Sequence, residues 1–129
     1  MSESMSKNKA LMRRIYEEMW NARNPSLAVE IFDQPEGVER FVSQFLASFP
    51  DLQHTIEGMI EEGDQVAVQF AARGTHQGSW LQFPPTARSI QYTGVTVAHI
   101  EANKVVKHYT WWDKMSLVEQ IRESLKSST

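Results

Sequence analysis

The spacing of the apolar residues changes at Pro50. Between Glu36 and Phe49 they recur at i, i+3, i+4 and i+7, which is the clearest helical pattern in the chain. Pro50 ends this pattern, because the residue before a proline is displaced from the helical region of backbone space. From Leu52 onward, apolar and polar residues alternate, as they do in a half-buried strand. The change predicts a helix before Pro50 and a β-sheet after it.

Two further helices are predicted nearer the N-terminus. The first runs from about Ser6 to Asn21 and carries a wide apolar stripe. The second is short and begins at Asn24-Pro25, where asparagine can cap and proline suits the first helical position. Tyr16 and Trp20 belong to the stripe of the first helix. They can wall a ligand pocket, although aromatic residues in such a stripe are more often part of the core.

The second half of the chain predicts strands Leu52–Glu61, Gln65–His76, Arg88–Ile100 and Val105–Trp112. Alternation in the first strand places His54, Ile56 and Ile60 on one face. Gly94 is expected to interrupt the third strand, because glycine weakens strand interiors. A last helix starts between Asp113 and Ser116 and runs to about Leu125.

This order of elements is typical of an α+β fold. We expect a curled antiparallel sheet in meander order, with the N-terminal helices packed on its concave face and a short C-terminal helix. Such a cone holds either a core or a small-molecule pocket.

The last strand carries the residues best suited to chemistry. Its alternation places Val106, His108, Thr110 and Trp112 on one face, and Val105, Lys107, Tyr109 and Trp111 on the other. The first face holds an imidazole, a hydroxyl and an indole. If that face lines a cavity, it is the candidate site. The alternative is a half-buried aromatic cluster with a structural role.

The composition limits the possible partners. The 129 residues suit one domain, residues 1–129, and the net charge of −3 argues against nucleic acid or an anionic membrane as the main partner. The chain has no cysteine, which excludes disulfides and thiolate metal sites and fits a cytoplasmic protein. Residues Met1 to Lys9 do not resemble a signal peptide. His54 and His99 can pair with acids, but their spacing predicts no metal site.

Several motifs resemble the SnoaL-like polyketide cyclases, which belong to the nuclear transport factor 2-like superfamily of cone-shaped α+β proteins. The similarity covers Phe49 to Asp113 well and Tyr16 to Asn21 less closely. The motifs are Phe49-Pro50-Asp51-Leu52, Gly74-Thr75-His76-Gln77-Gly78, Pro84-Pro85-Thr86, and His108 followed by Trp111-Trp112-Asp113.

The resemblance implies a ring-closing intramolecular aldol condensation of an aromatic polyketide ester, with no metal or organic cofactor. The family's catalytic acid is expected two residues after the late histidine, where this chain has Thr110. A threonine hydroxyl cannot act as a base near neutral pH. A polar pocket residue on the third strand corresponds to Thr96. The usual strand between the second and third helices is missing at 32–37, so the mouth is expected to be wider or covered by a partner subunit.

We therefore expect His108 to transfer protons, with Asp113 as the neighbouring acid and helix capping as the alternative role of Asp113. Substrate contacts are expected from Tyr16, Trp20, His76, Tyr92, Thr96, Thr110 and Trp112. A structural role for His76 in its loop is the alternative.

The expected ligand is small and apolar or aromatic, and the apolar outer row of Val95, Val97, Tyr109 and Trp111 predicts a homodimer. Three functions stay open: a cofactor-free ester cyclase, a binding or scaffold protein that has lost the catalytic acid, and, less favoured, an isomerase or epoxide hydrolase of the same fold.

Overall fold

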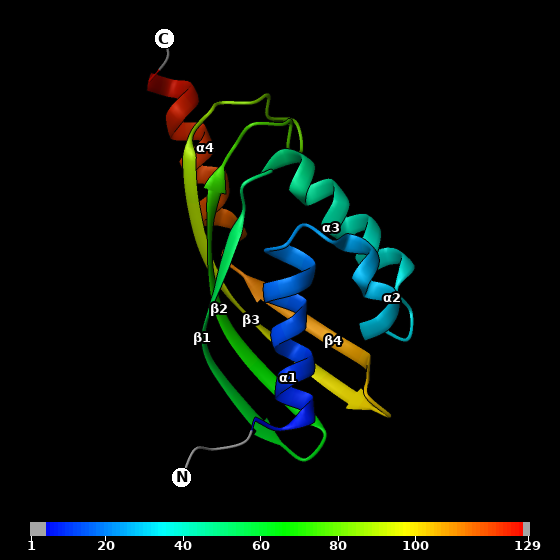
Figure 1. Ribbon diagram of the computed structural model, residues 1–129. Coiled ribbons are helices and arrows are strands. Elements are labelled where there is room, and N and C mark those ends of the chain that lie inside the picture. The colour runs from blue at the N-terminus through cyan, green and yellow to red at the C-terminus, as the bar shows by residue number, and fades with distance from the viewer. Residues whose placement is uncertain (1–4, 128–129) are drawn as a thin grey trace.

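The computed structural model describes residues 5–127. Helices cover one face of a single four-stranded sheet (Figure 1). In chain order the elements are α1 (Lys7–Arg14), η1 (Ile15–Trp20), η2 (Pro25–Leu27), α2 (Ala28–Ile31), α3 (Glu36–Ser48), β1 (Gln53–Glu62), β2 (Gln65–Thr75), β3 (Ser89–Glu101), β4 (Lys104–Trp112) and α4 (Lys114–Ser127).

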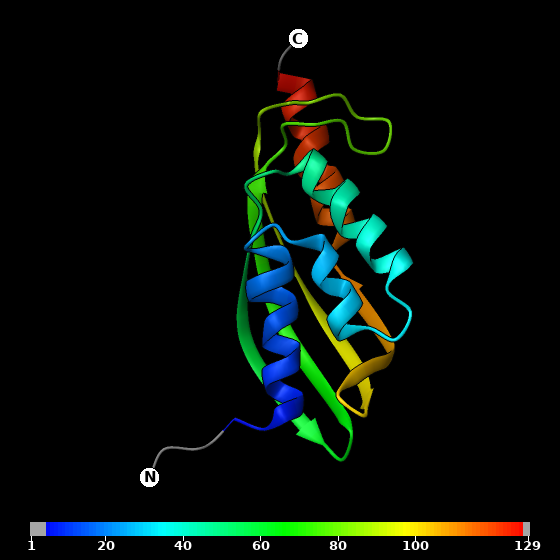
Figure 2. The ribbon, with the colours of Figure 1, turned by 45° about the vertical axis from the view of Figure 1, so that its right-hand side comes forward.

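The sheet has the order β1-β2-β3-β4, and all three neighbouring pairs are antiparallel. This confirms the predicted meander and the α+β class. The sheet is curled rather than closed, and α1, α2 and α3 lie within its curve (Figure 2). The buried apolar residues of β2, namely Val66, Val68, Phe70 and Ala72, form the floor beneath these helices as predicted.

The first helix changes its winding halfway. After Arg14 it continues as a π-helical segment, η1, in which the Asn21 amide bonds the Tyr16 carbonyl at 3.0 Å. The Asn24 amide bonds the Met19 carbonyl at 2.9 Å in the same way. A π segment is rare and is often found at functional sites. Here it carries Tyr16 and Trp20, both buried against the sheet.

A bulge in β1 overturns one part of the predicted strand face. The register against β2 shifts between Ile56 and Gly58. The extra residue reverses the alternation beyond it. Ile60 was expected to face inward with His54, but it is 74% exposed, and Met59 is packed against the core instead.

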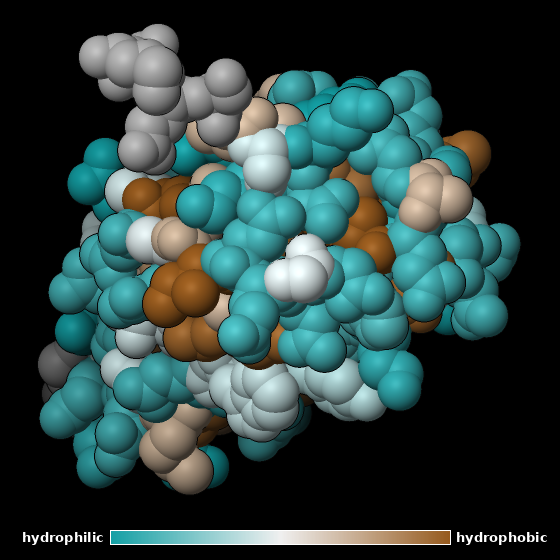
Figure 3. Space-filling model, turned by 90° about the horizontal axis from the view of Figure 1, so that it is seen from below, coloured by the Kyte–Doolittle hydropathy of each residue, from teal (hydrophilic) through white to brown (hydrophobic). Residues whose placement is uncertain are grey.

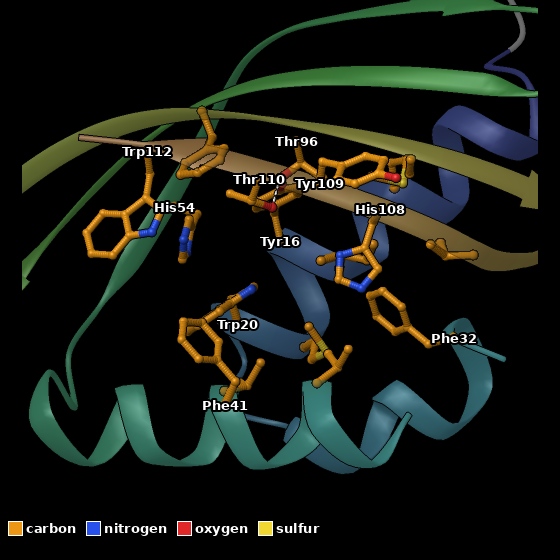
Figure 4. A pocket seen from close by; sticks show the side chains of 18 of the residues that line it. Tyr16, Trp20, Phe32, Phe41, His54, Thr96, His108, Tyr109, Thr110 and Trp112 are labelled. Atoms are coloured by element: carbon orange, nitrogen blue, oxygen red, sulfur yellow. Dashed lines mark hydrogen bonds between the residues drawn. The ribbon is translucent and has the colours of Figure 1, made fainter. Parts of the chain in front are cut away.

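A second irregularity changes the start of β4. The register against β3 shifts between His99 and Ile100, so Val105 is 1% exposed and belongs to the core. The expectation that Val105 would share the outer face with Tyr109 was therefore wrong. His108 lies beyond the shift and keeps its predicted orientation toward the inside of the curl (Figure 4).

Gly94 does not interrupt β3, which is continuous from Ser89 to Glu101. The glycine is required by close packing: a Cβ atom there would lie 2.6 Å from the Phe70 ring and 2.8 Å from Trp112 Cβ. The missing side chain therefore lets aromatic groups from β2 and β4 approach the middle strand.

Helix α4 covers the part of β3 that extends beyond the end of β4. The Asp113 carboxylate accepts a bond from the Ser116 amide at 3.0 Å and caps the helix. The Gln120 side-chain amide then bonds both the backbone amide and the carbonyl of Gln91, at 3.0 and 2.7 Å. This side chain takes the place of a neighbouring strand and satisfies the free edge of β3.

Among residues 5–127, no helix is long and apolar enough to cross a membrane. Seen from below, the molecule is mainly hydrophilic, and its apolar side chains form separate patches (Figure 3). The concave face of the sheet and the helices over it enclose the apolar cavity described next.

Candidate active site

A cavity of about 770 Å³ lies between the concave face of the sheet and the helices α1, η1 and α3. Its volume is within the range of pockets that hold small organic molecules. Aromatic side chains provide much of its lining: Tyr16, Trp20, Phe32, Phe41, Phe45, Phe70, Tyr92 and Trp112. The cavity in the cone that the sequence predicted is therefore present.

The predicted inner face of β4 lines this cavity. His108, Thr110 and Trp112 all contribute to it (Figure 4). His108 and Thr110 remain exposed to solvent, so the cavity is open along β4. We call these two residues, together with Phe32, the open wall. The His108 ring packs against the Phe32 ring with centroids 5.1 Å apart, and partial burial lowers the pKa of His108.

The open wall results from the short connection between α2 and α3. In this connection Phe32 forms a single parallel bridge with Val105, and the Asp33 amide bonds the Val105 carbonyl at 3.1 Å. No longer strand covers the outer edge of β4 within the described residues. The strand that was expected to be missing at 32–37 is thus reduced to this single bridge, which leaves the cavity open on that side.

Three hydroxyl groups form a chain at the centre of the cavity. The Tyr16 hydroxyl donates to Thr96 Oγ1 at 2.7 Å, and Thr96 Oγ1 lies 2.8 Å from Thr110 Oγ1. Burial raises the pKa of Tyr16 to about 12, so its hydroxyl stays protonated and acts as a donor. The chain therefore connects η1, β3 and β4 through polar groups within an otherwise apolar lining (Figure 4).

His54 lines the cavity but was not among the predicted site residues. It is only 7% exposed, and its ring lies 4.9 Å from the Trp20 ring, 5.4 Å from Phe70 and 5.5 Å from Tyr16, centroid to centroid. We call these four residues the inner wall. Burial, with a smaller effect from the positive charge of Arg23, lowers the pKa of His54 to about 4. The signal in the sequence was an imidazole on the apolar face of the first strand.

The remaining predicted contacts divide between the cavity and the rest of the molecule. Tyr92 lies beside Trp112, with ring centroids 4.9 Å apart, and burial raises the pKa of Tyr92. Phe45 contacts the same indole at 5.9 Å. These rings form one end of the cavity, and Tyr92, Trp20, Thr96 and Tyr16 all line it.

His76 and Asp113 do not line the cavity. His76 is fully buried beneath the loop that follows β2, where its Nδ1 bonds the Thr86 hydroxyl at 2.9 Å. This is the structural alternative considered for it. Asp113 is exposed and caps α4, because the end of β4 turns it away from the concave face. Of the described residues lining the cavity, only Glu36 is a carboxylate, and it lies exposed in the first turn of α3.

A second polar cluster lies at the strand ends. His99 Nε2 is 2.8 Å from the Asp64 carboxylate and 3.3 Å from that of Glu101. Pairing with acids was considered possible for both His54 and His99 from the sequence, and in the structure His99 is paired in this way whereas His54 is not. All three side chains are partly or fully exposed. They are not part of the cavity.

Comparison with known proteins gives a consistent assignment. The family model for SnoaL-like polyketide cyclases matches residues 10–121. A comparison with curated proteins found no match.

Three solved structures illustrate the similarity. A proposed polyketide cyclase from Acidithiobacillus ferrooxidans is 25% identical, with a TM-score of 0.83 over 96% of this chain and 99% of the other. AclR, a proposed hydroxylase from Streptomyces galilaeus, is 23% identical, with a TM-score of 0.84 over 93% and 83%. TsrD from Streptomyces laurentii is 18% identical, with a TM-score of 0.82 over 93% and 98%. The last two, below 25% identity, show the fold alone.

The family match spans most of the chain, including the whole sheet, most of the helical residues and every residue that lines the cavity. On this basis, the chain belongs to the SnoaL-like polyketide cyclase family.

Proposed function

We propose that this protein is a cofactor-free enzyme that closes a ring in an aromatic polyketide-like ester by intramolecular aldol condensation. The observation that carries the proposal is the open wall: a histidine and a hydroxyl that share one strand face and line an aromatic cavity. The aromatic lining suits a planar substrate, since its rings can stack and pack against flat apolar surfaces.

In this proposal His108 transfers the proton. Its lowered pKa keeps the imidazole neutral near pH 7, so that it can accept a proton from the carbon next to the ester carbonyl. The electron pair left on that carbon delocalises onto the ester oxygen as an enolate. The enolate carbon then forms the new bond to a ketone carbon of the same molecule. The resulting alkoxide takes back the proton from the His108 imidazolium.

Thr110 stabilises the enolate by hydrogen bonding and does not act as an acid. Thr96 Oγ1 already accepts the proton of Tyr16. When Thr96 in turn donates to Thr110, Thr96 acts once as acceptor and once as donor, Thr110 accepts, and the Thr110 proton is free for a ligand oxygen. A donor held in place before the reaction stabilises developing charge without reorganisation. The hydroxyl chain thus compensates in part for the absent family acid.

The test is a ring-closure assay on a polycyclic aromatic polyketide ester with the native protein and with Thr110→Asp. We expect turnover by the native protein and faster turnover by the variant, since the carboxylate supplies a second acid–base group beside His108 where the threonine hydroxyl cannot act as one. Absence of ring closure in both proteins, with the cavity still binding an aromatic ester, rejects the enzymatic proposal.

A binding protein without catalysis is the second candidate. It is favoured by the absence of any carboxylate from the inner lining, where Glu36 at the exposed start of α3 is the only acid among the described residues. This candidate predicts tight binding of an aromatic ligand that is recovered unchanged. The same assay separates the two candidates when the bound compound is extracted and identified.

We also propose that the outer face of the sheet is covered by a second copy of the chain. Val95 is 37% exposed, Tyr109 52% and Trp111 61%, and the last two rings stack with centroids 5.9 Å apart. Such a continuous aromatic surface is costly to leave in water. Sedimentation at micromolar concentration should show a dimer, and Trp111→Lys should give a monomer. A native monomer contradicts this proposal.

A further inference from the structure

The three aromatic rings of the inner wall enclose the His54 ring, yet no residue within 5–127 forms a hydrogen bond with either of its ring nitrogens. Two buried side-chain atoms of the described residues lack a hydrogen-bond partner, Nδ1 of His54 and Nε2 of His76. Only His54 lines the cavity. Polar groups buried at this level are nearly always paired in native proteins. The fold therefore uses neither ring nitrogen of this cavity residue for a hydrogen bond among the described residues.

The backbone of His54 is held in place from two sides. Its amide donates to Asn21 Oδ1 at 2.7 Å, and Asn21 Nδ2 donates to its carbonyl at 2.9 Å. Asn21 directly follows the π segment that carries Tyr16 and Trp20. The same segment thus positions the rings around His54 and the strand from which it projects (Figure 4). The imidazole has a defined place in the cavity before any ligand binds.

The surroundings also define which nitrogen carries the proton. Burial keeps the imidazole neutral, with one N–H group and one lone pair. Nδ1 is enclosed and has no acceptor near it. A buried N–H without an acceptor is rarer than an unused lone pair, so the lone pair belongs on Nδ1 and the proton on Nε2. Nε2 of His54 bonds no described residue and is not among the enclosed unpaired atoms, so it is the nitrogen through which the ring can reach a ligand.

This inference deepens the proposed function and rests on it only in requiring that the cavity binds a ligand. We propose that His54 donates a hydrogen bond from Nε2 to a carbonyl oxygen of a planar polycyclic aromatic ketone or quinone. An uncharged acceptor is required, because no lysine or arginine lines the cavity within the described residues to balance an anion. Bonding to the N–H group polarises the carbonyl, which makes its carbon a better electrophile for ring closure.

Fluorenone and fluorene test this proposal, since they share a flat tricyclic shape and differ in the carbonyl group. Their affinities are measured by calorimetry for the native protein and for His54→Phe, which keeps an aromatic ring and removes both nitrogens. We expect the ratio of fluorenone to fluorene affinity to fall by about tenfold in His54→Phe, the value of one hydrogen bond. Fluorene should bind both proteins alike, and His99→Gln, on the surface, should leave the ratio unchanged.

The carbonyl stretching frequency of bound fluorenone identifies the donor directly. In the native protein it should shift to lower frequency, and the shift should vanish in His54→Phe but persist in Thr110→Val. The opposite pattern assigns the bond to the hydroxyl chain and overturns the proposal. An unchanged affinity ratio in His54→Phe, or no binding of fluorenone to the native protein, overturns it as well.

These measurements need no turnover. Loss of the frequency shift in His54→Phe supports the His54 proposal even where the ring-closure assay is negative. Turnover by the native protein with an unaltered shift in His54→Phe keeps the enzymatic proposal and rejects this one.

Discussion

The inner wall and the open wall of the cavity each present one histidine to the same space. His54 on β1 is 7% exposed and surrounded by three aromatic rings, whereas His108 on β4 is exposed and contacts one ring, that of Phe32. Burial lowers the pKa of both, and it lowers that of His54 to about 4. Water therefore reaches the imidazole of the open wall more readily than that of the inner wall.

This difference suggests a division of labour between identical side chains. A buried ring that stays neutral over the physiological range suits a fixed hydrogen bond, and a ring in contact with water suits proton transfer. Burial decides the role, since the two side chains are chemically the same. The four predictions below test this contrast.

The largest effect is expected at the open wall. His108→Ala should lower the rate of ring closure by about a thousandfold, because it removes the group that transfers the proton. The affinity for an aromatic ligand should change by no more than about twofold, since the stacking surfaces remain. Steady-state kinetics and calorimetry measure the two quantities. A variant that keeps its activity would place proton transfer elsewhere, and His99→Ala serves as a surface control.

The second prediction concerns the inner wall and pH. The pKa of His54 falls from 6.5 in the unfolded chain to about 4 in the folded protein. Between these values the unfolded chain binds more protons, so stability decreases as the pH falls through this window. The loss should reach about 3 kcal/mol near pH 4. Urea denaturation at several pH values measures it.

His54→Phe should remove this part of the pH dependence, and its stability at neutral pH should be equal or higher because no nitrogen is left unpaired. His108→Phe is the matched variant at the open wall and should alter the pH dependence much less. Equal changes in the two variants would show that the walls do not differ in burial as described.

The third prediction concerns the strand between the walls. Gly94→Ala places a Cβ atom 2.6 Å from the Phe70 ring and 2.8 Å from Trp112 Cβ. We expect a loss of about 2 kcal/mol in the free energy of unfolding, typical of overpacking. Gly37→Ala is the control, because nothing lies within 4 Å of that position in α3, and alanine there should stabilise the helix by up to about 1 kcal/mol.

The smallest effect is expected at the hydroxyl chain. Tyr16→Phe removes the donor to Thr96 but keeps the ring that packs against His54 and Phe70. Stability should fall by about 1 kcal/mol, and ring closure should slow by about tenfold. Denaturation and kinetics measure the two changes. A loss as large as that of His108→Ala would mean that Tyr16 itself carries the proton.

Much of the site was accessible from local sequence pattern. Alternation placed His108, Thr110 and Trp112 on one strand face, and the apolar stripe placed Tyr16 and Trp20 on the helix that covers it. Both patterns depend on the geometry of a single strand or helix, so they can be recognised without knowledge of the fold. The change of period at Pro50 identified the order of helices and strands for the same reason.

The tertiary structure alone decided which side chains are enclosed and which are exposed. The bulge after Ile56 exposed Ile60, and the shift at His99 buried Val105, because register depends on the neighbouring strand. His54 became a cavity residue through rings from η1 and β2, which lie far from it in the sequence. Asp113 became a helix cap because the chain turns away from the concave face at that point. Alternation can assign a residue to a face, but its burial and pKa depend on which distant segments pack against it.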